Sequence, residues 1–469
     1  MRNTLKTLGI LCIIAATVFI AACGDLPEAE NVYTVKFDSD GGSFVSPITV
    51  PADGTGTVTK PNDPTKNDLT DPGLYKNFTG YTFGGWELNG APYSFGTPVD
   101  SDITLKAKWT LRGEKVTLSG TGDVVTQAFA AINAATIAAG DKYILYINAD
   151  VNPVAAALTL TKANANLTIT SDRERDIKSP NLSTVTGKVF LTVGVASGQN
   201  TSISLTLKNV AVVGSGTPTG DSLIRVRNGA SLILDNKATV EKHINNVGTT
   251  SATTSNGDNG NGSAICVING GNLTIKTGAV IQENKSTGNQ NNKNLVGGIY
   301  AIGTASTKSV INIEGGDISG NESTDGNTAD IYITETVELH IKGNLTIGEL
   351  AINSDDGKYP DFRIDGRVTN KIKKFNLRST TGTLKTVQDA WTATNAKVFS
   401  GTADYVITLT DVAQFELWEF TGNTSLRGTG AKPDAPETWA NLISPTYEIV
   451  LVDKSGTTPN YGKLVKATP

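Results

Sequence analysis

The chain has 469 residues, with 40 Lys and Arg against 45 Asp and Glu, and 49 of its residues are Gly. This length suffices for two or three domains, and the formal net charge of −5 argues against nucleic acid or an anionic lipid surface as a partner. Only two His and three Cys are present, and their positions show no spacing typical of a zinc site. The abundance of Gly, Thr, Val, Ile and Asn favours strands and turns over helices.

The first 22 residues have the three parts of an export signal. Arg2 and Lys6 make the start positive, and residues 8–20 form an uncharged, mostly apolar run that is short for a membrane span. Residues 20–23 read IAAC and resemble the lipobox of bacterial lipoproteins. That resemblance implies removal of residues 1–22, lipid attachment at Cys23 and a tether at residues 23–31. The alternative is a helical anchor with an incidental cysteine.

The resemblance also implies a location and a redox state. Gly24, where Asp would favour retention in the inner membrane, favours the outer membrane or the cell surface. Cys12 leaves with the signal and Cys23 carries lipid, so Cys266 remains alone and no disulfide forms within the mature chain. More than one lipid chain on Cys23 would make the anchoring durable.

Residues 32–110 are expected to form a small β domain. Residues 33–37 (YTVKF) and 103–109 (ITLKAKW) alternate apolar and polar side chains, and residues 40–42 (DGG) make a tight turn. Together with residues 80–86 (GYTFGGW), this pattern resembles the Listeria–Bacteroides repeat, a β-grasp-like module of bacterial surface proteins that commonly serves as a spacer. We expect Trp86 and Trp109 to pack in its core; the alternative is a platform that stacks a ligand. The stretch Pro61 to Lys76 is longer than in the compact repeat.

The second region, residues 113–375, begins with apolar residues at helical spacing, namely Val125, Ala128, Phe129 and Ile132. They resemble the helical cap of a parallel β-helix. An internal repeat follows, in which residues 222–227, 263–268, 297–302 and 329–334 align. The repeat places apolar residues in shared columns, which are Ile224, Ile265, Ile299, Ile331; Val226, Val267, Ala301, Ile333; Leu234, Ile275, Ile313, Ile341; and Val240, Ile281, Ile318, Ile347. The spacing varies while the strand order does not, as in a solenoid whose loops lengthen freely.

Polar positions support the same alignment. The residue after the second strand alternates in charge from coil to coil, as Lys208, Asp235, Lys276, Glu314 and Lys342. Stacked strands lie about 4.8 Å apart, so alternating signs favour this register. Asn284 and Asn321 occupy matching turns and are expected to form an asparagine ladder. Polar loops at residues 244–262, 286–296 and 320–328 are expected to leave the coil at equivalent points as solvated decoration.

The outward column beside the aligned isoleucines reads Arg225, Cys266, Tyr300 and Tyr332. We select Arg225, Tyr300 and Tyr332 as a candidate surface for sugar or protein; the alternative is the ordinary outer face of a sheet. Cys266 is interpreted as a half-covered small residue rather than a nucleophile. His340 is interpreted as a surface residue of a strand.

The ordered coils resemble right-handed parallel β-helix proteins of the pectate-lyase-like superfamily. Residues 315–321 (GGDISGN) are similar to phrases in repeat-rich surface proteins of spirochaetes and chlamydiae. Residues 376–469 contain further strands, at 405–410, 415–420 and 447–453, the last pairing with residues 463–466. We expect a β-rich cap there; a separate β domain is the alternative. The expected fold is therefore all-β, with a β-grasp-like module, a three-sheet right-handed parallel β-helix with an N-terminal capping helix, and a C-terminal cap.

Function follows less directly from the sequence. A β-helix lyase needs several carboxylates on one sheet to hold Ca²⁺, and a hydrolase needs a carboxylate pair across a cleft. The aligned strands instead carry single, alternating charges, so we expect no catalytic residues, no metal and no cofactor. The leading hypothesis is a monomeric, membrane-anchored surface lipoprotein that binds a host or matrix glycan or protein. The alternatives are a carbohydrate-active lyase or hydrolase and a purely structural coat protein.

Overall fold

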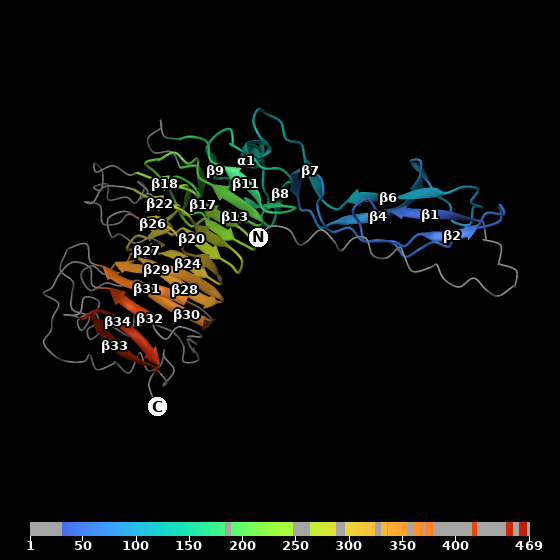
Figure 1. Ribbon diagram of the computed structural model, residues 1–469. Helices are drawn as coiled ribbons and strands as arrows, with labels where there is room; N and C mark the ends of the chain where they lie inside the picture. The colour runs from blue at the N-terminus through green and yellow to red at the C-terminus, as the bar shows by residue number, and fades with distance from the viewer. Residues whose placement is uncertain are drawn as a thin grey trace. The chain divides into compact units, whose positions relative to one another are not determined.

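The computed structural model describes residues 31–182, 189–246, 263–287, 296–323, 330–334 and 336–353, together with the backbone of five later strands. The chain divides into two compact units. Unit 1 contains residues 1–67 and 81–110, and unit 2 contains residues 68–80 and 111–469. The fold is all-β apart from one helix in the described part of the chain (Figure 1).

Unit 1 is a five-stranded sheet in the order β2-β1-β6-β4-β5. Its strands are β1 (Val32–Asp38), β2 (Ile48–Pro51), β4 (Tyr81–Leu88), β5 (Ala91–Pro92) and β6 (Ile103–Leu111). β1 pairs in parallel with β6 and antiparallel with β2. The inward side chains expected from the alternation, including Val35, Leu105 and Ala107, are buried in its core. The strands predicted in this region are thus confirmed.

Unit 2 is a parallel β-helix whose coils stack one on another. Each full coil contributes one strand to a ten-stranded sheet, which we call sheet I, and one strand to each of two rows of a second sheet. Sheet I contains β30 (Asp361–Val368), β28 (Val337–Gly343), β24 (Ser309–Ile313), β20 (Asn272–Ile275), β16 (Ser231–Leu234), β13 (Ser204–Leu207), β10 (Asn166–Ser171), β8 (Tyr143–Ile147), β3 (Gly73–Lys76) and β7 (Glu114–Val116).

The two rows of the second sheet meet at β29 (Leu345–Asn353), which pairs with both. Row A contains β11 (Arg175–Lys178), β14 (Val210–Val213), β17 (Thr239–Glu241), β21 (Val280–Gln282) and β25 (Gly316–Ile318). Row B contains β9 (Leu158–Leu160), β12 (Leu191–Val193), β15 (Ile224–Arg227), β19 (Ile265–Ile268), β23 (Ile299–Ile302) and β27 (Ile331–Ile333). A small parallel sheet of β18 (Ile244–Asn245), β22 (Lys285–Ser286) and β26 (Glu322–Ser323) lies at the bases of the three expected loops. Residues 247–262, 288–295 and 324–329 of those loops lie outside the described residues.

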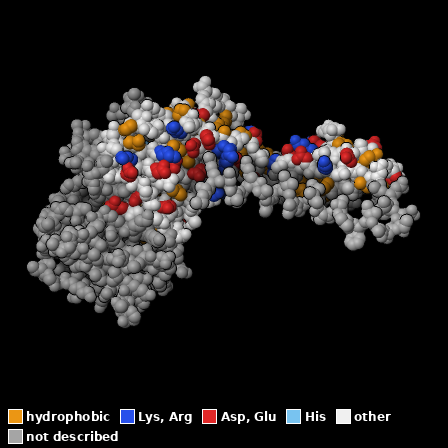
Figure 2. Space-filling view, viewed as in Figure 1, with side chains coloured by type: hydrophobic (Ala, Val, Ile, Leu, Met, Phe, Trp, Pro, Cys, Tyr) orange, Lys and Arg blue, Asp and Glu red, His pale blue; other side chains and the backbone are white. Residues whose placement is uncertain are grey.

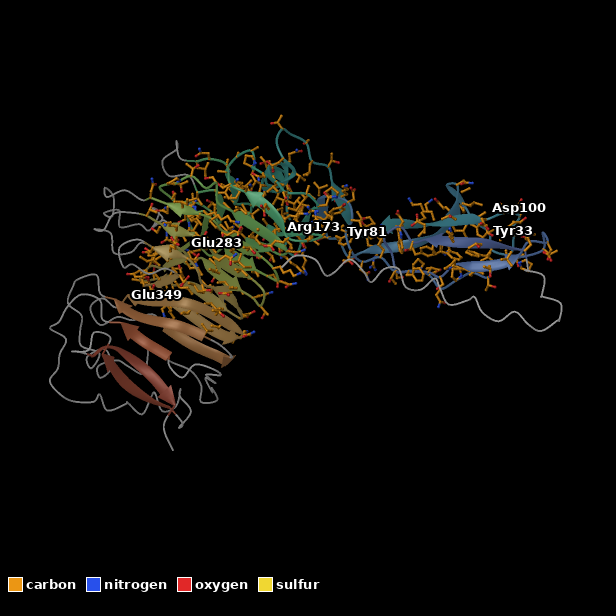
Figure 3. The ribbon with its side chains drawn as sticks, viewed as in Figure 1. Tyr33, Tyr81, Asp100, Arg173, Glu283 and Glu349 are labelled. Carbon is orange, nitrogen blue, oxygen red and sulfur yellow. The ribbon has the colours of Figure 1, made fainter. Side chains whose placement is uncertain are left out.

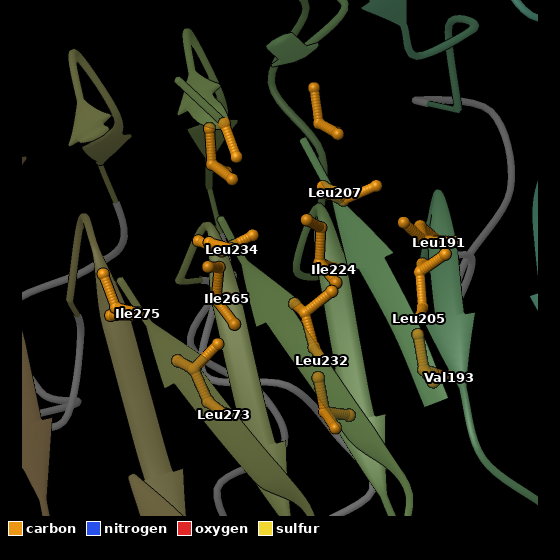
Figure 4. Close-up of a cluster of buried hydrophobic side chains, with 14 of the residues drawn as sticks. Leu191, Val193, Leu205, Leu207, Ile224, Leu232, Leu234, Ile265, Leu273 and Ile275 are labelled. Carbon is orange, nitrogen blue, oxygen red and sulfur yellow. The ribbon is translucent and has the colours of Figure 1, made fainter. Parts of the chain in front are cut away.

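The interior of the coil is a stack of aliphatic columns, as the repeat predicts. Ile224, Ile265 and Ile299 are Cα partners in successive strands of row B, and Leu205, Leu232 and Leu273 are partners in sheet I. All are buried, and Figure 4 shows such side chains from both sheets facing one another across the coil. Each fully buried side chain of this kind contributes roughly 1.5–3 kcal/mol, so the columns are the main source of stability.

Helix α1 (Val124–Ala134) lies where the cap was expected and buries the four apolar residues that predicted it. Its N-cap is Asp123, whose side chain accepts a hydrogen bond from the Thr126 amide at 2.9 Å. An acceptor at this position satisfies one of the free amides of the first turn. The helix contacts β9, β3 and β8, so it covers the first coil.

One segment departs from the predicted domain boundaries. Residues 68–80 fall inside the expected first domain, yet they belong to unit 2, where β3 pairs antiparallel with β8 and with β7. The stretch Pro61 to Lys76, noted in the sequence only as longer than in the compact repeat, therefore supplies β3, the strand between β8 and the edge strand β7 of sheet I. Strand β3 is only four residues long, and no clear alternation marked it in the sequence.

The C-terminal strands continue the second sheet. They are β31 (Lys371–Arg378), β32 (Phe415–Glu419), β33 (Tyr447–Asp453) and β34 (Pro459–Lys466). β31 pairs in parallel with β29, β32 pairs with β31, and β33 and β34 form an antiparallel pair. The predicted pairing of residues 447–453 with 463–466 is confirmed. The strand predicted at residues 405–410 lies outside the described residues.

Candidate functional site

The outward column of row B has the predicted register. Arg225, Cys266, Tyr300 and Tyr332 are Cα partners in successive coils. Their exposure differs from the expectation, because Arg225 is 8% exposed, Tyr300 5% and Tyr332 1%, and Cys266 is fully buried rather than half-covered. Cys266, Tyr300 and Tyr332 therefore form a buried cluster with Ile268 and Val296, and the column is not an accessible strip.

The two tyrosines and Arg225 of this column each contact a neighbouring side chain. Tyr300 and Tyr332 stack with ring centroids 5.7 Å apart and an angle of 7° between their planes. The guanidinium of Arg225 donates from Nη2 to Oδ1 of Asp221 at 2.6 Å, and both side chains are buried. A buried ion pair of this kind holds its two charges against one another. Because both rings are buried, the column presents no exposed aromatic face to a ligand.

The predicted asparagine ladder lies at the corner where row A turns toward row B. Asn284 and Asn321 are buried, and the Asn284 side-chain amide donates to Oδ1 of Asn321 at 2.9 Å. Asn284 Nδ2 also donates to the Val240 carbonyl, and Asn321 Nδ2 donates to the Ile281 carbonyl. Each of these bonds reaches one coil away and is 3.0 Å long. Each amide thus satisfies a backbone group that the turn leaves free.

The ladder ends on a carboxylate that the sequence analysis missed. Asp330, which is 3% exposed, accepts from Asn321 Nδ2 at 2.8 Å and from the Asn321 amide at 3.3 Å. Burial raises the pKa of Asp330 to about 6, with a smaller contribution from the charge of Glu349, although these hydrogen bonds oppose the shift. One feature of the sequence could have revealed Asp330. The other coils have Leu223, Ala264 and Gly298 at the aligned position, so a carboxylate is unusual there.

A second buried titratable group begins the same corner. His243 is buried, and its backbone amide donates to Oδ1 of Asn284 at 3.1 Å. Burial lowers the pKa of His243 to about 4, and a hydrogen bond with the Asp221 backbone opposes the shift. The imidazole is therefore neutral at physiological pH. His243, Asn284, Asn321 and Asp330 form one line of buried polar residues, which we call the corner ladder.

The exterior of sheet I carries the predicted charge alternation. Lys276 Nζ lies 3.6 Å from Asp235 Oδ2, and Lys342 Nζ lies 2.9 Å from Glu314 Oε1. His340 lies on the same face, half-buried, with Nε2 3.8 Å from Glu338 Oε2. Figure 2 shows basic and acidic side chains side by side over unit 2 rather than in patches of one sign. Paired charges of this kind favour register and offer little field to steer a charged ligand.

In unit 1 the two tryptophans pack as predicted. Trp86 is buried and meets the Phe37 ring edge to face at 4.9 Å between centroids. Trp109 packs against the same core and donates from Nε1 to the Ser39 carbonyl at 3.0 Å. Beside it lies Lys66, a residue that sequence reasoning missed, with its Nζ 6.0 Å from the Trp109 ring centroid. Its signal was weak, because it stands alone in a Pro- and Asp-rich stretch.

The remaining features considered in the sequence are the export signal, a membrane span and a metal site. Cys23 and the export signal lie outside the described residues. Among the residues that the structure describes, no helix is long and apolar enough to span a membrane. In the same part of the chain, no group of three or more His, Cys, Asp or Glu is placed to hold a metal ion.

Comparison with known families now identifies one part of the chain. Residues 33–108 match the Listeria-Bacteroides repeat domain. The match covers the strands of unit 1 and also residues 68–80, the segment of unit 2 that interrupts unit 1 along the chain. We call this segment the excursion. None of the curated proteins and none of the solved structures compared with the chain gives a match. The repeat domain is thus the part of the molecule with an established family, and the solenoid is characterised by its own geometry.

Proposed function

We propose that the protein is a lipid-anchored surface scaffold, in which Cys23 carries the lipid and the β-helix is displayed for adhesion to a host or matrix glycan or protein. The observation that carries the proposal is the order of parts in one chain. A lipobox-like IAAC sequence precedes a repeat domain of the kind found on bacterial surface proteins, and a β-helix follows. The location that fits is the outer membrane or the cell surface.

The short tether supports a membrane-proximal place for the repeat domain. Strand β1 begins at Val32, and residues 23–31 reach at most about 30 Å when fully extended. Two or more lipid chains on Cys23 would hold the protein durably, since each buried CH₂ contributes about 0.8 kcal/mol. The repeat domain would then stand close to the lipid.

The exterior of sheet I supports a scaffold over an enzyme. Carboxylates on this face, such as Asp235, Glu314 and Glu338, each lie within 4 Å of a lysine Nζ on a neighbouring coil. Hydrolysis of glycosides requires two carboxyl groups set across a substrate, one of them with a raised pKa. The paired carboxylates here are arranged for stacking. We therefore propose that the protein is not an enzyme, uses no cofactor and works as a monomer.

Two experiments test these proposals separately. In a bacterial expression host, metabolic labelling with an alkyne fatty acid should mark the wild type and not Cys23→Ser, while Cys266→Ser should label normally. Protease added to intact cells should remove the wild type if it is displayed. An unlabelled wild type would refute the anchor, and protection from protease would refute surface display.

Adhesion itself is tested with the purified mature protein. Flow-cell binding to matrix proteins and to a glycan panel should give saturable binding to at least one class. Absence of binding across the panel would refute adhesion, and a purely structural coat protein would then be the remaining hypothesis. Incubation with pectin, alginate and glycosaminoglycans, followed by ultraviolet absorbance and reducing ends, should show no turnover. Turnover would refute the non-enzymatic assignment.

A further inference from the structure

The excursion of residues 68–80 makes the chain cross between the two units three times, after residues 67, 80 and 110. We propose that this segment couples the folding of the repeat domain to that of the β-helix, so that the repeat domain stabilises the first coil through the chain and is not an independent spacer. The inference concerns how the two units depend on one another and does not rest on the proposed adhesion.

In unit 2 the segment is built into the first coil. Leu74 of β3 is fully buried in the solenoid core and is the Cα partner of Leu145 in β8. Tyr75, on the other face, packs with Leu69 and Tyr146, and its hydroxyl donates to the Asp71 carbonyl at 2.7 Å. Both faces of β3 are thus occupied, and the strand covers the edge of β8 that would otherwise be open.

Polar contacts fix the end of β3 to the turn that precedes β8. The Asn77 side chain donates to Oδ1 of Asp141 at 2.9 Å and accepts from the Lys142 amide at 2.9 Å. Lys76 Nζ lies 2.9 Å from Asp141 Oδ2. Hydrogen bonds from Asn77 and Lys76 lower the pKa of Asp141 to about 2, so its charge is retained across the physiological range.

In unit 1 the chain on either side of the excursion is held together at Lys66 and Tyr81. The Tyr81 amide donates to the Lys66 carbonyl at 3.0 Å, so the chain leaves and returns at adjacent points. The Lys66 side chain is only 7% exposed; its Nζ donates to the Asp40 carbonyl at 2.6 Å and lies 4.9 Å from the Tyr81 ring centroid. Trp109, which precedes the third crossing, provides the second ring. Tyr81 is labelled in Figure 3. We call Lys66 with its two rings the clamp.

The coupling follows from chain entropy. A four-residue strand has little stability of its own, and ordering each residue costs about 1–2 kcal/mol. While unit 1 is folded, the clamp fixes both ends of residues 68–80, so the loop is already closed when β3 pairs with β8. When unit 1 unfolds, the same pairing must also close a loop in a free chain. Strand β3 should then dissociate more often and expose the edge of β8.

Hydrogen exchange on the full mature chain tests this dependence. Leu105→Ala removes a fully buried side chain from the core of unit 1 and lies outside the excursion. We expect at least tenfold faster exchange in β3 and several-fold faster exchange in β8, with β24 unchanged as an internal reference. If exchange accelerates in β1 and β6 while β3 and β8 keep their protection, the units are independent and the proposal is wrong. This holds even if Leu105→Ala unfolds unit 1 entirely.

A milder pair of variants tests the clamp. Lys66→Met keeps much of the side-chain volume but removes the charge between the rings and the hydrogen bond to Asp40. Lys60→Met is the matched control, since Lys60 is half exposed and pairs only with the exposed Asp63 at 2.8 Å among the contacts described. Lys66→Met should accelerate exchange in β3 several-fold, and Lys60→Met should leave it unchanged. Equal exchange in the two variants would show that the clamp has no part in the coupling.

Discussion

Lys342 Nζ lies 2.9 Å from Glu314 Oε1, although the two residues belong to successive coils of the β-helix. The same relationship recurs one pair earlier on sheet I, between Lys276 and Asp235. Because stacked coils bring equivalent positions within about 5 Å, a sequence that alternates in sign at one position gives each charge an opposite neighbour. The contact is therefore evidence of register, and it leads directly to a stability prediction.

Glu314→Lys should destabilise the β-helix through like charges on three successive coils. Exposed pairs contribute about 0.2–1 kcal/mol, so we expect a loss of about 1 kcal/mol in the free energy of unfolding at low salt. The loss should shrink at high salt, because screening weakens repulsion between exposed charges. Chemical denaturation at two salt concentrations measures it, with Glu314→Gln as the control for simple loss of the pair. A loss that does not depend on salt would contradict an electrostatic origin.

Asn321→Ala should be more costly, because Asn321 is buried in the corner ladder. The substitution removes the Asn321 oxygen that accepts from the side-chain and backbone amides of Asn284, and the Nδ2 that donates to the Ile281 carbonyl. A buried polar group left unsatisfied costs about 1–3 kcal/mol. We expect the free energy of unfolding to fall by about 2–4 kcal/mol in a denaturant titration. Asn272→Ala, which removes a half-buried amide from the exterior of sheet I, should cost less than about 1 kcal/mol. Equal losses would mean that burial does not set the cost.

The raised pKa of Asp330 predicts that its contribution to the free energy of unfolding falls as pH rises. Its pKa is about 6 in the folded chain and 3.8 as a reference, so the folded state binds more protons than the unfolded state between these values. The stability gained from protonation is present below about pH 4 and is lost as pH rises through 6. Asp330→Asn should remove this dependence. The difference in unfolding free energy between wild type and variant should change by roughly 1–3 kcal/mol between pH 4 and pH 7. A constant difference would place the Asp330 pKa at its ordinary value.

The lowered pKa of His243 predicts the opposite dependence, in which its contribution to the free energy of unfolding falls as pH falls. Its pKa is about 4 in the folded chain against 6.5 as a reference, so between these values the folded state binds fewer protons. The stability associated with the neutral imidazole is present above about pH 6.5 and is lost as pH falls toward 4. In His243→Gln the unfolding free energy should therefore fall less than in the wild type between pH 7 and pH 4.5. Nuclear magnetic resonance titration of the imidazole checks the cause directly, and a midpoint near 6.5 would refute it.

The register of the β-helix was predictable because one property repeats. Apolar residues such as Ile224 and Ile265 align across loops of different length, and the charge column at Lys276 and Glu314 agrees with them independently. Burial of the outward column was not predictable in the same way. The sequence around Tyr300 and Tyr332 shows that these side chains point away from the coil interior, but it does not show that they are buried there in a cluster with Val296.

The missed residues share a different cause, since each depends on a partner that no local sequence pattern reveals. Leu74 and Tyr75 belong to a strand too short to show alternation, and their place is decided by β8, far along the chain. Asp330 occupies a column whose other members are apolar or small, and it is stable there because Asn321 donates to it. Export and lipidation at Cys23 stay predictions, and they depend on contiguous sequence rather than on a distant partner.

The three chain crossings have a mechanical consequence for a protein anchored at its N-terminus. In a chain of domains joined by single linkers, tension applied at one end passes through each linker in turn. Here a pull on Cys23 would reach the solenoid through three covalent connections, and one of them leads straight into β3, whose hydrogen bonds to β7 and β8 run across the strand direction. Tension from such an anchor would therefore be divided among three connections instead of being carried by a single linker.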